Sequence, residues 1–438
     1  MKSSLLWGMA GLWLVLAPTW SWAQPAEPES LNLATSFELA VKNSPRLAEL
    51  KAKIGEIQGR VDEAYVAAYP QLDFTAGYTR VEPQVIGNFG PNPVIIQPAN
   101  NHQLALTLRQ TIFSFGRLRW NTSAAELTRR STEEEYRVEL EQTFLDTARI
   151  YYDALLAARR LEVSEQRLQS QQAQKDQAEK LFARGTVARF DVLQAEAELS
   201  RVEQQVLESR NAARLSVDLL ASKLGRPLDQ GLKLSDSLPK ELTKQNLELE
   251  AATSQALEKR PEMSVLRWAI EAGESRISAQ DAGNAPSLDL QSQVINRNVT
   301  GFAPGTQWTT GLVFSVPLFD GGLSDARRDQ AVKVVEQLRH SREGVERQIR
   351  LEVREIHYLL DNLREQHQVA LKNLTQAREA QRVASLRYQE GFSTQVEWLA
   401  AQSAYSDAQQ LVYQAERDYQ VALARWNRAI SGPYAVPI

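Results

Sequence analysis

The sequence predicts an α+β membrane protein in which a β-barrel, shared between several chains, is continued by long α-helices packed as a coiled coil. Three observations predict this fold class: an internal duplication, two runs of strong helix formers far longer than an ordinary helix, and four segments in which apolar and polar side chains alternate strictly. Each half of the chain is therefore expected to repeat one plan: a helix, a β-hairpin, a long helix and a return helix.

The N-terminus has the features of a secretory signal peptide over residues 1–23. An apolar stretch at 5–16 precedes Ser21 and Ala23, the small residues expected before a cleavage site. This stretch is too short to span a membrane, and no later segment keeps the roughly 18 uninterrupted apolar residues that mark a transmembrane helix. Because the sequence has no Cys, we expect neither disulfides nor a lipid-modified N-terminus.

The rest of the chain is internally duplicated. YPQLDF and APSLDL match at a displacement of 216 residues, and IFSFGR and LFDGGL match at a displacement of 206. The second displacement continues through Gly185 and Gly391 to Pro227 and Pro433. The predicted domains are the signal peptide at 1–23, a first repeat at 24–232, a connector or equatorial segment at 233–249 and a second repeat at 250–438.

Each repeat is expected to contain a middling helix, over about 33–68 and 250–283, and a very long one. Residues 117–184 contain neither Gly nor Pro, and the matching run 323–388 contains only Gly344. At about 1.5 Å per residue, each long helix would extend roughly 100 Å. Return helices are expected at 187–225 and 393–430, and apolar residues at three- and four-residue steps indicate coiled-coil packing. From the helices alone, a soluble bundle or tether remains an alternative.

The alternating segments predict two β-hairpins, at 70–113 and 286–318. Each strand is about ten residues long, enough to cross a bilayer at a tilt. Four strands cannot close a barrel, and open edges are not tolerated in a membrane, so several chains must share one barrel. A small soluble sheet packed on helices is the alternative. The faces expected toward lipid carry Leu106, Leu290 and Phe314, and those expected toward the lumen carry Thr107, Gln291 and Ser315.

Composition and motifs argue against other function classes. The formal net charge is -4, without the clustered basic face that nucleic-acid binding needs. The sequence has four His residues, none in a metal-binding spacing, and it has no GxSxG, Walker-type or GxGxxG motif. We therefore expect no enzyme, no catalytic residue, no cofactor and no metal site.

Several strings resemble those of the TolC-like outer-membrane efflux proteins, the outer membrane factors. They are YPQLDF, LRQTIFSFGR, LFARGTVARFDVLQA, APSLDL, FSVPLFDGG and LRYQEGFSTQVEWLAA. Their order, spacing and duplication cover nearly the whole mature chain. The resemblance implies a homotrimer with a twelve-stranded β-barrel, four strands per chain, continued by a tapering α-helical coiled-coil barrel. It also implies a partly structured belt, here at 226–250 and 431–438.

The resemblance further implies a location in the outer membrane, surrounded by its lipid and extending into the periplasm. Members of this family act as the exit duct of a tripartite efflux or type I secretion system, together with a periplasmic adaptor and an inner-membrane transporter. A periplasmic helical tether or scaffold without a pore is the alternative function. Drugs, metal ions and secreted polypeptides all stay open as substrates.

The family closes its duct at the periplasmic tip, where the helix pairs turn. The residues at matching positions are Phe182, Gly185, Asp191, Tyr388, Gly391, Ser393 and Glu397 for the gate, and Thr186, Val187, Phe392 and Ser393 for adaptor docking. Tyr388 matches a tyrosine in the closing contacts of the family. Ser393 replaces a latching arginine and Ala400 replaces the second of two acids, which puts that latch in doubt and leaves one acidic ring. Three copies of Glu397 would crowd carboxylates around one axis; an ordinary solvated carboxylate is the alternative.

Overall fold

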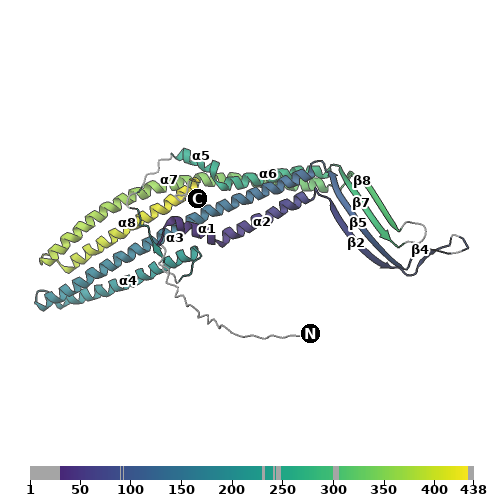
Figure 1. Ribbon diagram of the computed structural model, residues 1–438. Coiled ribbons are helices and arrows are strands. Elements are labelled where there is room, and N and C mark those ends of the chain that lie inside the picture. Colours follow the sequence, from purple (N-terminus) through teal and green to yellow (C-terminus); the bar gives the residue numbers. More distant parts are fainter. Residues whose placement is uncertain are drawn as a thin grey trace, which may run out of the picture.

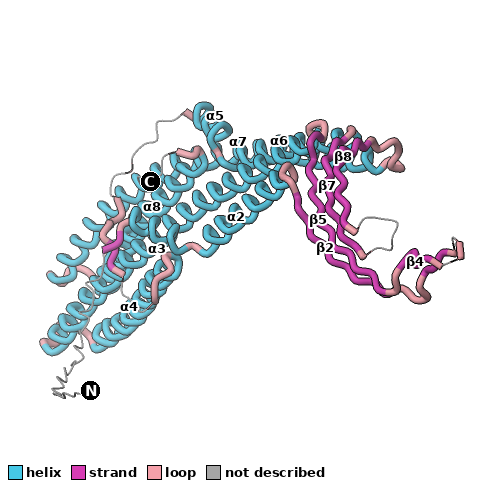
Figure 2. Tube along the Cα trace, turned by 45° about the vertical axis from the view of Figure 1, so that its right-hand side comes forward, coloured by secondary structure: helices cyan, strands magenta, loops and turns pink. Residues whose placement is uncertain are grey.

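The computed structural model describes residues 30–432, apart from 89, 92, 229–231, 240–241, 243–247 and 299–304. The described residues form an elongated bundle of antiparallel helices that ends on one side in a β-sheet (Figure 1). The strands leave the helix ends at an angle, so the sheet turns away from the bundle (Figure 2). The expected signal peptide at 1–23 and the end of the C-terminal tail at 433–438 lie outside the described residues.

Two helices of 67 residues each, α3 (Arg117–Ala183) and α7 (Leu323–Gln389), run the length of the bundle. Each begins after a glycine with a left-handed backbone, Gly116 at φ 88° and Gly322 at φ 84°, which lets the chain turn sharply from strand into helix. The return helices α4 (Arg189–Lys223) and α8 (Gln395–Ala429) have 35 residues each and pack back along α3 and α7. In the part of the chain that the structure describes, no helix is both long and apolar enough to cross a membrane.

The middling helix expected as one piece in each repeat is broken in two. The residue before a proline is disfavoured in the helical conformation, and Ser44 and Arg260 have extended backbones, with ψ 115° and 131°. The proline that follows suits the first position of a new helix, where no N–H is needed. The four helices are α1 (Leu33–Asn43), α2 (Pro45–Val66), α5 (Leu249–Lys259) and α6 (Pro261–Asp281), the last followed by the 3-10 turn η1 (Ala282–Asn284).

One antiparallel sheet has the strand order β2-β5-β7-β8. Its strands are β2 (Gln71–Arg80), β5 (Asn100–Phe113), β7 (Ser287–Arg297) and β8 (Thr306–Ser315). Cross-strand pairing runs from Phe74 to Leu106, from Leu106 to Val294 and from Val294 to Trp308, so these four side chains share one face. By the same register, Leu290 and Phe314 lie on this apolar face, while Thr107, Gln291 and Ser315 lie on the polar one.

Two small pairings complete the described strands. β3 (Val85–Gly87) and β4 (Val94–Gln97) form a hairpin within the loop between β2 and β5. β1 (Ser30–Leu31) and β6 (Lys233–Leu234) pair in parallel and join the start of the described chain to the connector between the repeats. Tyr151 of α3 is fully buried there, and its hydroxyl donates to Asp236 Oδ2 at 2.8 Å. The connector is thereby tied to the middle of α3.

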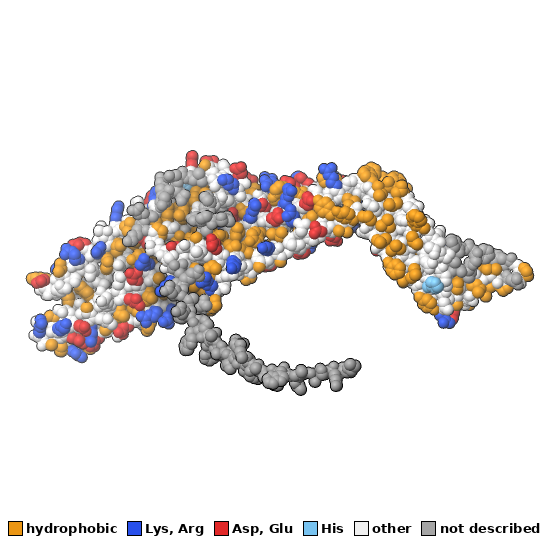
Figure 3. All heavy atoms as spheres, in the orientation of Figure 1, with side chains coloured by type: hydrophobic (Ala, Val, Ile, Leu, Met, Phe, Trp, Pro, Cys, Tyr) orange, Lys and Arg blue, Asp and Glu red, His pale blue; other side chains and the backbone are white. Residues whose placement is uncertain are grey.

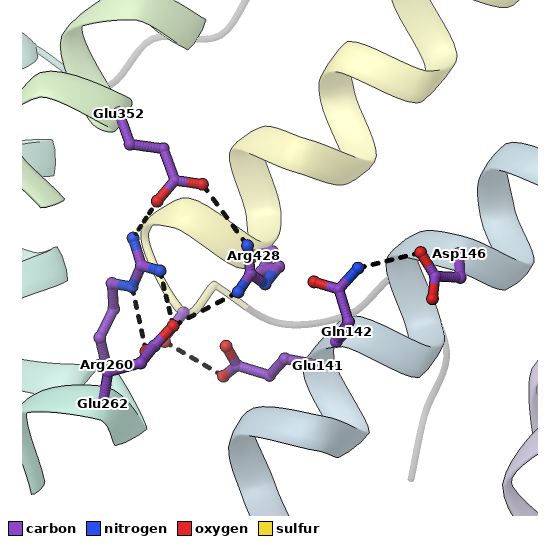
Figure 4. A network of polar contacts seen from close by, with 8 residues as sticks. Glu141, Gln142, Asp146, Arg260, Glu262, Glu352 and Arg428 are labelled. Carbon is purple, nitrogen blue, oxygen red and sulfur yellow. Dashed lines mark hydrogen bonds and ion pairs between the residues drawn. The ribbon is translucent and has the colours of Figure 1, made fainter. Parts of the chain in front are cut away.

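A cluster of two arginines and two glutamates holds the break before α6 (Figure 4). Arg260 is 3% exposed and donates to Glu262 at 2.7 Å and to Glu352 of α7 at 2.6 Å. Arg428 of α8 lies 3.4 Å from Glu262 and 3.5 Å from Glu352. Burial alone would raise the pKa of Glu262, but the hydrogen bond and charge of Arg260 hold it below its ordinary value. The break is therefore fastened to both α7 and α8.

Candidate functional site

Two tight turns close the helix hairpins at the end of the bundle far from the sheet (Figure 1). Gly185 and Gly391 take left-handed backbones there, with φ 76° and 79°. The N–H of Thr186 donates to the carbonyl of Leu181 at 3.0 Å, and the N–H of Phe392 donates to that of Arg387 at 2.7 Å. These bonds satisfy the last helical carbonyls in a Schellman arrangement, which glycine adopts without a steric penalty.

The return helices start differently in the two hairpins. In α4 the Asp191 carboxylate accepts a hydrogen bond from the N–H of Ala188 at 3.0 Å. In α8 the Thr394 hydroxyl accepts from the N–H of Glu397 at 3.3 Å, so a different side chain caps the helix. The Glu397 side chain is exposed. Asp191 is thus engaged with its own backbone, whereas the Glu397 carboxylate extends from the cap toward solvent.

Tyr388 is where the two hairpins meet. Its ring lies 6.3 Å from that of Trp398, measured between centroids, and its hydroxyl is buried close to Gln174 of α3 and Asp191 of α4. Burial raises the pKa of Tyr388, and the Asp191 carboxylate adds to the rise against a lowering by the Gln174 amide. The structure therefore brings together two of the predicted gate residues, Tyr388 and Asp191.

Glu397 and Ser393 lie in a separate place, a shallow groove between α7 and α8 that Glu379 and Arg387 also line. Neither Tyr388 nor Asp191 lines this groove. The Ser393 hydroxyl is buried there without a hydrogen-bond partner among the described residues. Within the described ranges, no group of three or more His, Cys, Asp or Glu side chains is arranged to hold a metal ion.

The predicted docking residues form the outer surface of the two turns. Phe392 is 74% exposed, Thr186 is exposed, and Val187 and Ser393 are half-buried. Phe182 is partly exposed, and the Arg189 guanidinium lies 5.8 Å from the centre of its ring. Phe190, which was not predicted, is 69% exposed on the first turn of α4. Both turns therefore present aromatic side chains to the solvent.

A buried layer of glutamines near the tip was also missed. Gln171 and Gln174 of α3 and Gln395 of α8 are all less than a tenth exposed. In each of them at least one amide atom has no hydrogen-bond partner in the described part of the chain. A buried polar group without a partner costs about 1–3 kcal/mol, so these amide groups lower the stability of the helix packing near the tip. Glutamine is common on solvated helix faces, and the sequence alone therefore gave no sign of its burial.

Comparison with known proteins identifies the family. The outer membrane efflux protein profile matches residues 37–226 and 252–432. The fusaric acid resistance protein FusA of Burkholderia cepacia is 24% identical over 69% of this chain, and the match spans only 57% of FusA. The alkaline protease secretion protein AprF of Pseudomonas aeruginosa is 24% identical, with 90% of this chain and 83% of AprF covered. The outer membrane protein TolC of Escherichia coli is 26% identical, with 89% and 80% covered.

The fold is also that of solved structures. The outer membrane protein VceC of Vibrio cholerae superposes with a TM-score of 0.76 at 20% identity, covering 91% of this chain and 96% of VceC. The family profile extends over far more than half of the chain and includes both helix hairpins and the sheet. The protein therefore belongs to the outer membrane efflux protein family and is an outer-membrane channel for efflux or secretion.

Proposed function

We propose that three copies of this chain close into one duct with a twelve-stranded β-barrel and a coiled-coil helical barrel. The duct would form the outer-membrane part of a tripartite efflux or type I secretion system. It would receive substrates from an inner-membrane transporter through a periplasmic adaptor that docks at the helical tip. The observation that carries this proposal is that both the sheet and the helix layer have an unpartnered element at each side, and that these sides could pair with those of a neighbouring copy.

The sheet has two open edges and one exposed apolar face. β2 and β8 each have one neighbour in the sheet, so both present unpaired backbone groups on their outer sides. On the apolar face, Phe74, Trp308 and Phe314 are each about two-thirds or more exposed. Pairing of β8 with β2 of the next copy would remove the edges, and lipid would cover the apolar face. A periplasmic tether without a pore would leave this face in water.

The helices have open edges in the same order. Near the sheet, α2 packs on α3, α3 on α6 and α6 on α7. Near the tip, α4 packs on α3, α3 on α8 and α8 on α7. In both halves α7 is one edge, and α2 or α4 is the other. These edges carry apolar side chains more than half exposed, including Leu207, Leu215 and Leu219 on α4 and Leu351, Tyr358 and Val369 on α7.

The equal lengths of corresponding helices support an internal duplication, with 67 residues in both α3 and α7 and 35 in both α4 and α8. Two similar halves in each of three chains would give a duct with approximate six-fold symmetry. Such a ring needs a head-to-tail contact that closes, which the two different edges of this chain would provide.

The tip would hold the gate. The buried Tyr388 would lie where the two hairpins of one chain meet, and the buried glutamine amide atoms without partners would lower the stability of the closed tip. Glu397 would supply one ring of three carboxylates near the axis, a site that favours cations. The surface formed by the exposed Thr186 and Phe392, together with the half-buried Val187 and Ser393, would be the docking site for the adaptor.

Disulfide trapping tests the ring. The chain has no Cys, so Leu215→Cys and Val369→Cys can be introduced together without background. Positions 215 and 369 lie at similar heights along the bundle axis. This follows from three contacts between neighbouring helices, which join Ser164 to Ser209, Arg160 to Gln414 and His367 to Glu416. Oxidation in the outer membrane should give covalent dimers and trimers and nothing larger. Dimers alone would indicate a two-fold contact, and higher ladders an open assembly; either result would overturn the proposal.

A further inference from the structure

Two arginines flank one tryptophan where α3 packs on α6. The Arg130 guanidinium of α3 lies 5.3 Å from the centre of the Trp268 ring of α6, and the Arg267 guanidinium lies 4.7 Å from it. The indole is half-buried and both arginines are exposed. Ser131, next to Arg130, donates to the carbonyl of Val265 at 3.0 Å and so fixes the two helices beside the ring. We name the three residues Arg130, Arg267 and Trp268 the arginine–tryptophan cluster.

Both guanidinium groups of the cluster lack an acidic partner. Another arginine of the same helix layer, Arg339, is paired with Glu274 at 2.8 Å. Among the described residues, no carboxylate forms an ion pair with Arg130 or Arg267. A guanidinium that lies over an aromatic ring keeps its in-plane N–H groups available, and these groups fit a carboxylate in a bidentate manner. The cluster therefore presents two unpaired cations that one ring holds in position.

The internal duplication does not account for the cluster. Under the two displacements, its residues correspond to Glu336, Lys51 and Ala52 in the other repeat. Glu336 lies 2.7 Å from Lys333, so the acid at the matching position already has a partner. The cluster thus occurs once per chain, and the packing of these helices does not require it at the corresponding place.

The seven-residue period of α3 shows which face of the helix layer carries the cluster. Arg130, Phe144 and Tyr151 are separated by multiples of seven residues, which bring a coiled-coil helix back to the same face. The Phe144 ring packs on that of Phe37 of α1, with 5.2 Å between centroids, and the Tyr151 hydroxyl donates to the Leu31 carbonyl of β1. In the proposed duct the interior stays open, so the face covered by α1 and β1 is the outer one.

The cluster lies away from the bilayer. Arg130 is 13 positions after Arg117, where α3 begins, and Trp268 is 13 positions before Asp281, where α6 ends. At about 1.5 Å per residue, each distance from the sheet end is about 20 Å. Lipid head groups extend only about 5–8 Å beyond the hydrocarbon core. Charged side chains cover this part of the helices, whereas the sheet carries few (Figure 3). The cluster therefore faces the periplasm, beyond the reach of the head groups.

We propose that the arginine–tryptophan cluster binds the carboxylates of an acidic peptide in the periplasm, namely the peptide stems of peptidoglycan. These stems carry free carboxylates on a fixed network, and a duct that leaves the outer membrane has to pass through it. The outer position of the cluster rests on the proposed duct. A closed trimer would carry three such sites on its outer wall, and three weak contacts to one network reinforce each other. The contacts would hold the duct in the cell wall.

Sedimentation with purified peptidoglycan sacculi tests the proposal. The full chain, purified in detergent, is mixed with intact sacculi and with sacculi from which an amidase has removed the peptide stems. Arg130→Gln with Arg267→Gln removes the two unpaired cations. Arg328→Gln with Arg339→Gln is the control of equal net charge, because both of these arginines are already paired with acids. We expect the first variant to bind intact sacculi at least roughly tenfold more weakly, the loss expected for one charge-assisted hydrogen bond. The control should bind like the unmodified protein.

Two further variants keep the charge and change its placement. Trp268→Leu removes the ring, and Arg130→Lys with Arg267→Lys removes the planar fork of donors. Both should bind more weakly than the unmodified protein and more tightly than the double glutamine variant. Unchanged binding by both would show that diffuse charge attraction, and not the cluster, holds the sacculi.

The remaining outcomes each decide against a specific statement. Equal binding of the unmodified protein to intact and stripped sacculi would overturn the peptide as ligand. Equal binding by the double glutamine variant, or equal weakening of the control, would overturn the cluster as the site. Binding to liposomes of phosphatidylethanolamine and phosphatidylglycerol that exceeds binding to sacculi, and needs the same arginines, would assign the cluster to lipid. A chain that binds sacculi through the cluster but forms no covalent trimer in the disulfide test would keep the peptide site and reject the duct.

Discussion

Asp191 and Glu397 stand at matching positions in the two hairpins, yet their carboxylates have different surroundings. The Asp191 carboxylate accepts a hydrogen bond from the Ala188 N–H, whereas in the second hairpin the Thr394 hydroxyl accepts one from the Glu397 N–H. A carboxylate bound to its own backbone is less available to passing ions than one that extends into solvent. An acidic residue at the same repeat position is thus expected to act differently in the two halves.

Glu397→Gln should lower the cation preference of the channel and weaken its block by divalent ions in planar-bilayer recordings. Three carboxylates around one axis attract cations, and glutamine removes the charge at nearly constant size. Asp191→Asn is the matched control and should change both quantities less. Unchanged selectivity and block in Glu397→Gln would place Glu397 on an ordinary solvated surface and the gate elsewhere.

Single residues show where sequence reasoning stops. Gly185 and Gly391 were predictable, because a turn between two long helices needs a left-handed residue. The burial of Gln171 and Gln395 was not, because α3 and α8 each pack against more than one other helix. Which face of a helix is covered depends on the partner helix, and a single sequence does not contain that pairing.

At the scale of elements, the contact between α7 and α8 contains a buried titratable pair. His367 of α7 lies 3.7 Å from Glu416 of α8, measured from Nε2 to Oε1, and each side chain is 5% exposed. Arg159 of α3, whose main partner is Glu162, also interacts electrostatically with Glu416, and Arg364 lies one turn away on α7, beside Asp361. Burial lowers the pKa of His367 below its ordinary value, so the imidazole is neutral in the folded protein at neutral pH.

This pair predicts loss of stability in acid. Unfolded His binds a proton near pH 6.5, while the folded form binds it only at lower pH. The contribution of neutral His367 to the free energy of unfolding is therefore complete above about pH 6.5 and is lost as the pH falls below it. Thermal unfolding of the purified protein should shift down by roughly 1 °C between pH 7.5 and 5.5, because about 1 kcal/mol per chain is divided by the unfolding entropy of a long chain. His367→Leu should remove part of this dependence. A rise in stability on acidification would show that the His367–Glu416 ion pair outweighs burial.

The elements themselves were predictable to different degrees. Period-two alternation predicted both the strands and their common apolar face, because side-chain direction follows directly from strand geometry. The breaks before α2 and α6 were missed, because a proline opening a helix and a proline inside one look alike in sequence. Contacts around Pro45 and Pro261 make each of them the first residue of a helix. The Ser44 hydroxyl caps α2 at the N–H of Leu47, and Arg260 is bound by Glu262 and Glu352.

At the scale of the whole molecule, the two ends of the chain have different surfaces. At the sheet end, one face exposes a concentration of large apolar side chains, whereas the tip has two small turns with isolated exposed aromatics among polar helices. Trimer closure could not be predicted from residue patterns alone, because it depends on edges that only another copy can fill. The resemblance to the family implied it, and the matching edges now support it.

The tip is expected to bind the adaptor, and paired substitutions test this. Phe392→Ser with Val187→Ser should abolish export while leaving the trimer level in the outer membrane unchanged, because both side chains lie on the turns outside the helical core. Leu411→Ser, an exposed change farther along α8, is the matched control and should export normally. Normal export by the double variant would contradict the docking site. So would crosslinks from positions 186 and 392 that reach only partners located at the sheet half of the duct.

The two edges of each copy differ in continuity. One edge is a single helix, α7, which runs unbroken from the sheet to the tip, whereas the other is divided between α2 and α4. The divided edge is held at its division by the Asn43 amide, which donates to the Leu224 carbonyl at 2.6 Å. In a closed ring, every contact between copies would then pair a continuous helix of one copy with a divided edge of the next. If the tip widened, α7 would move as one rigid helix, and the neighbouring copy would bend between α2 and α4.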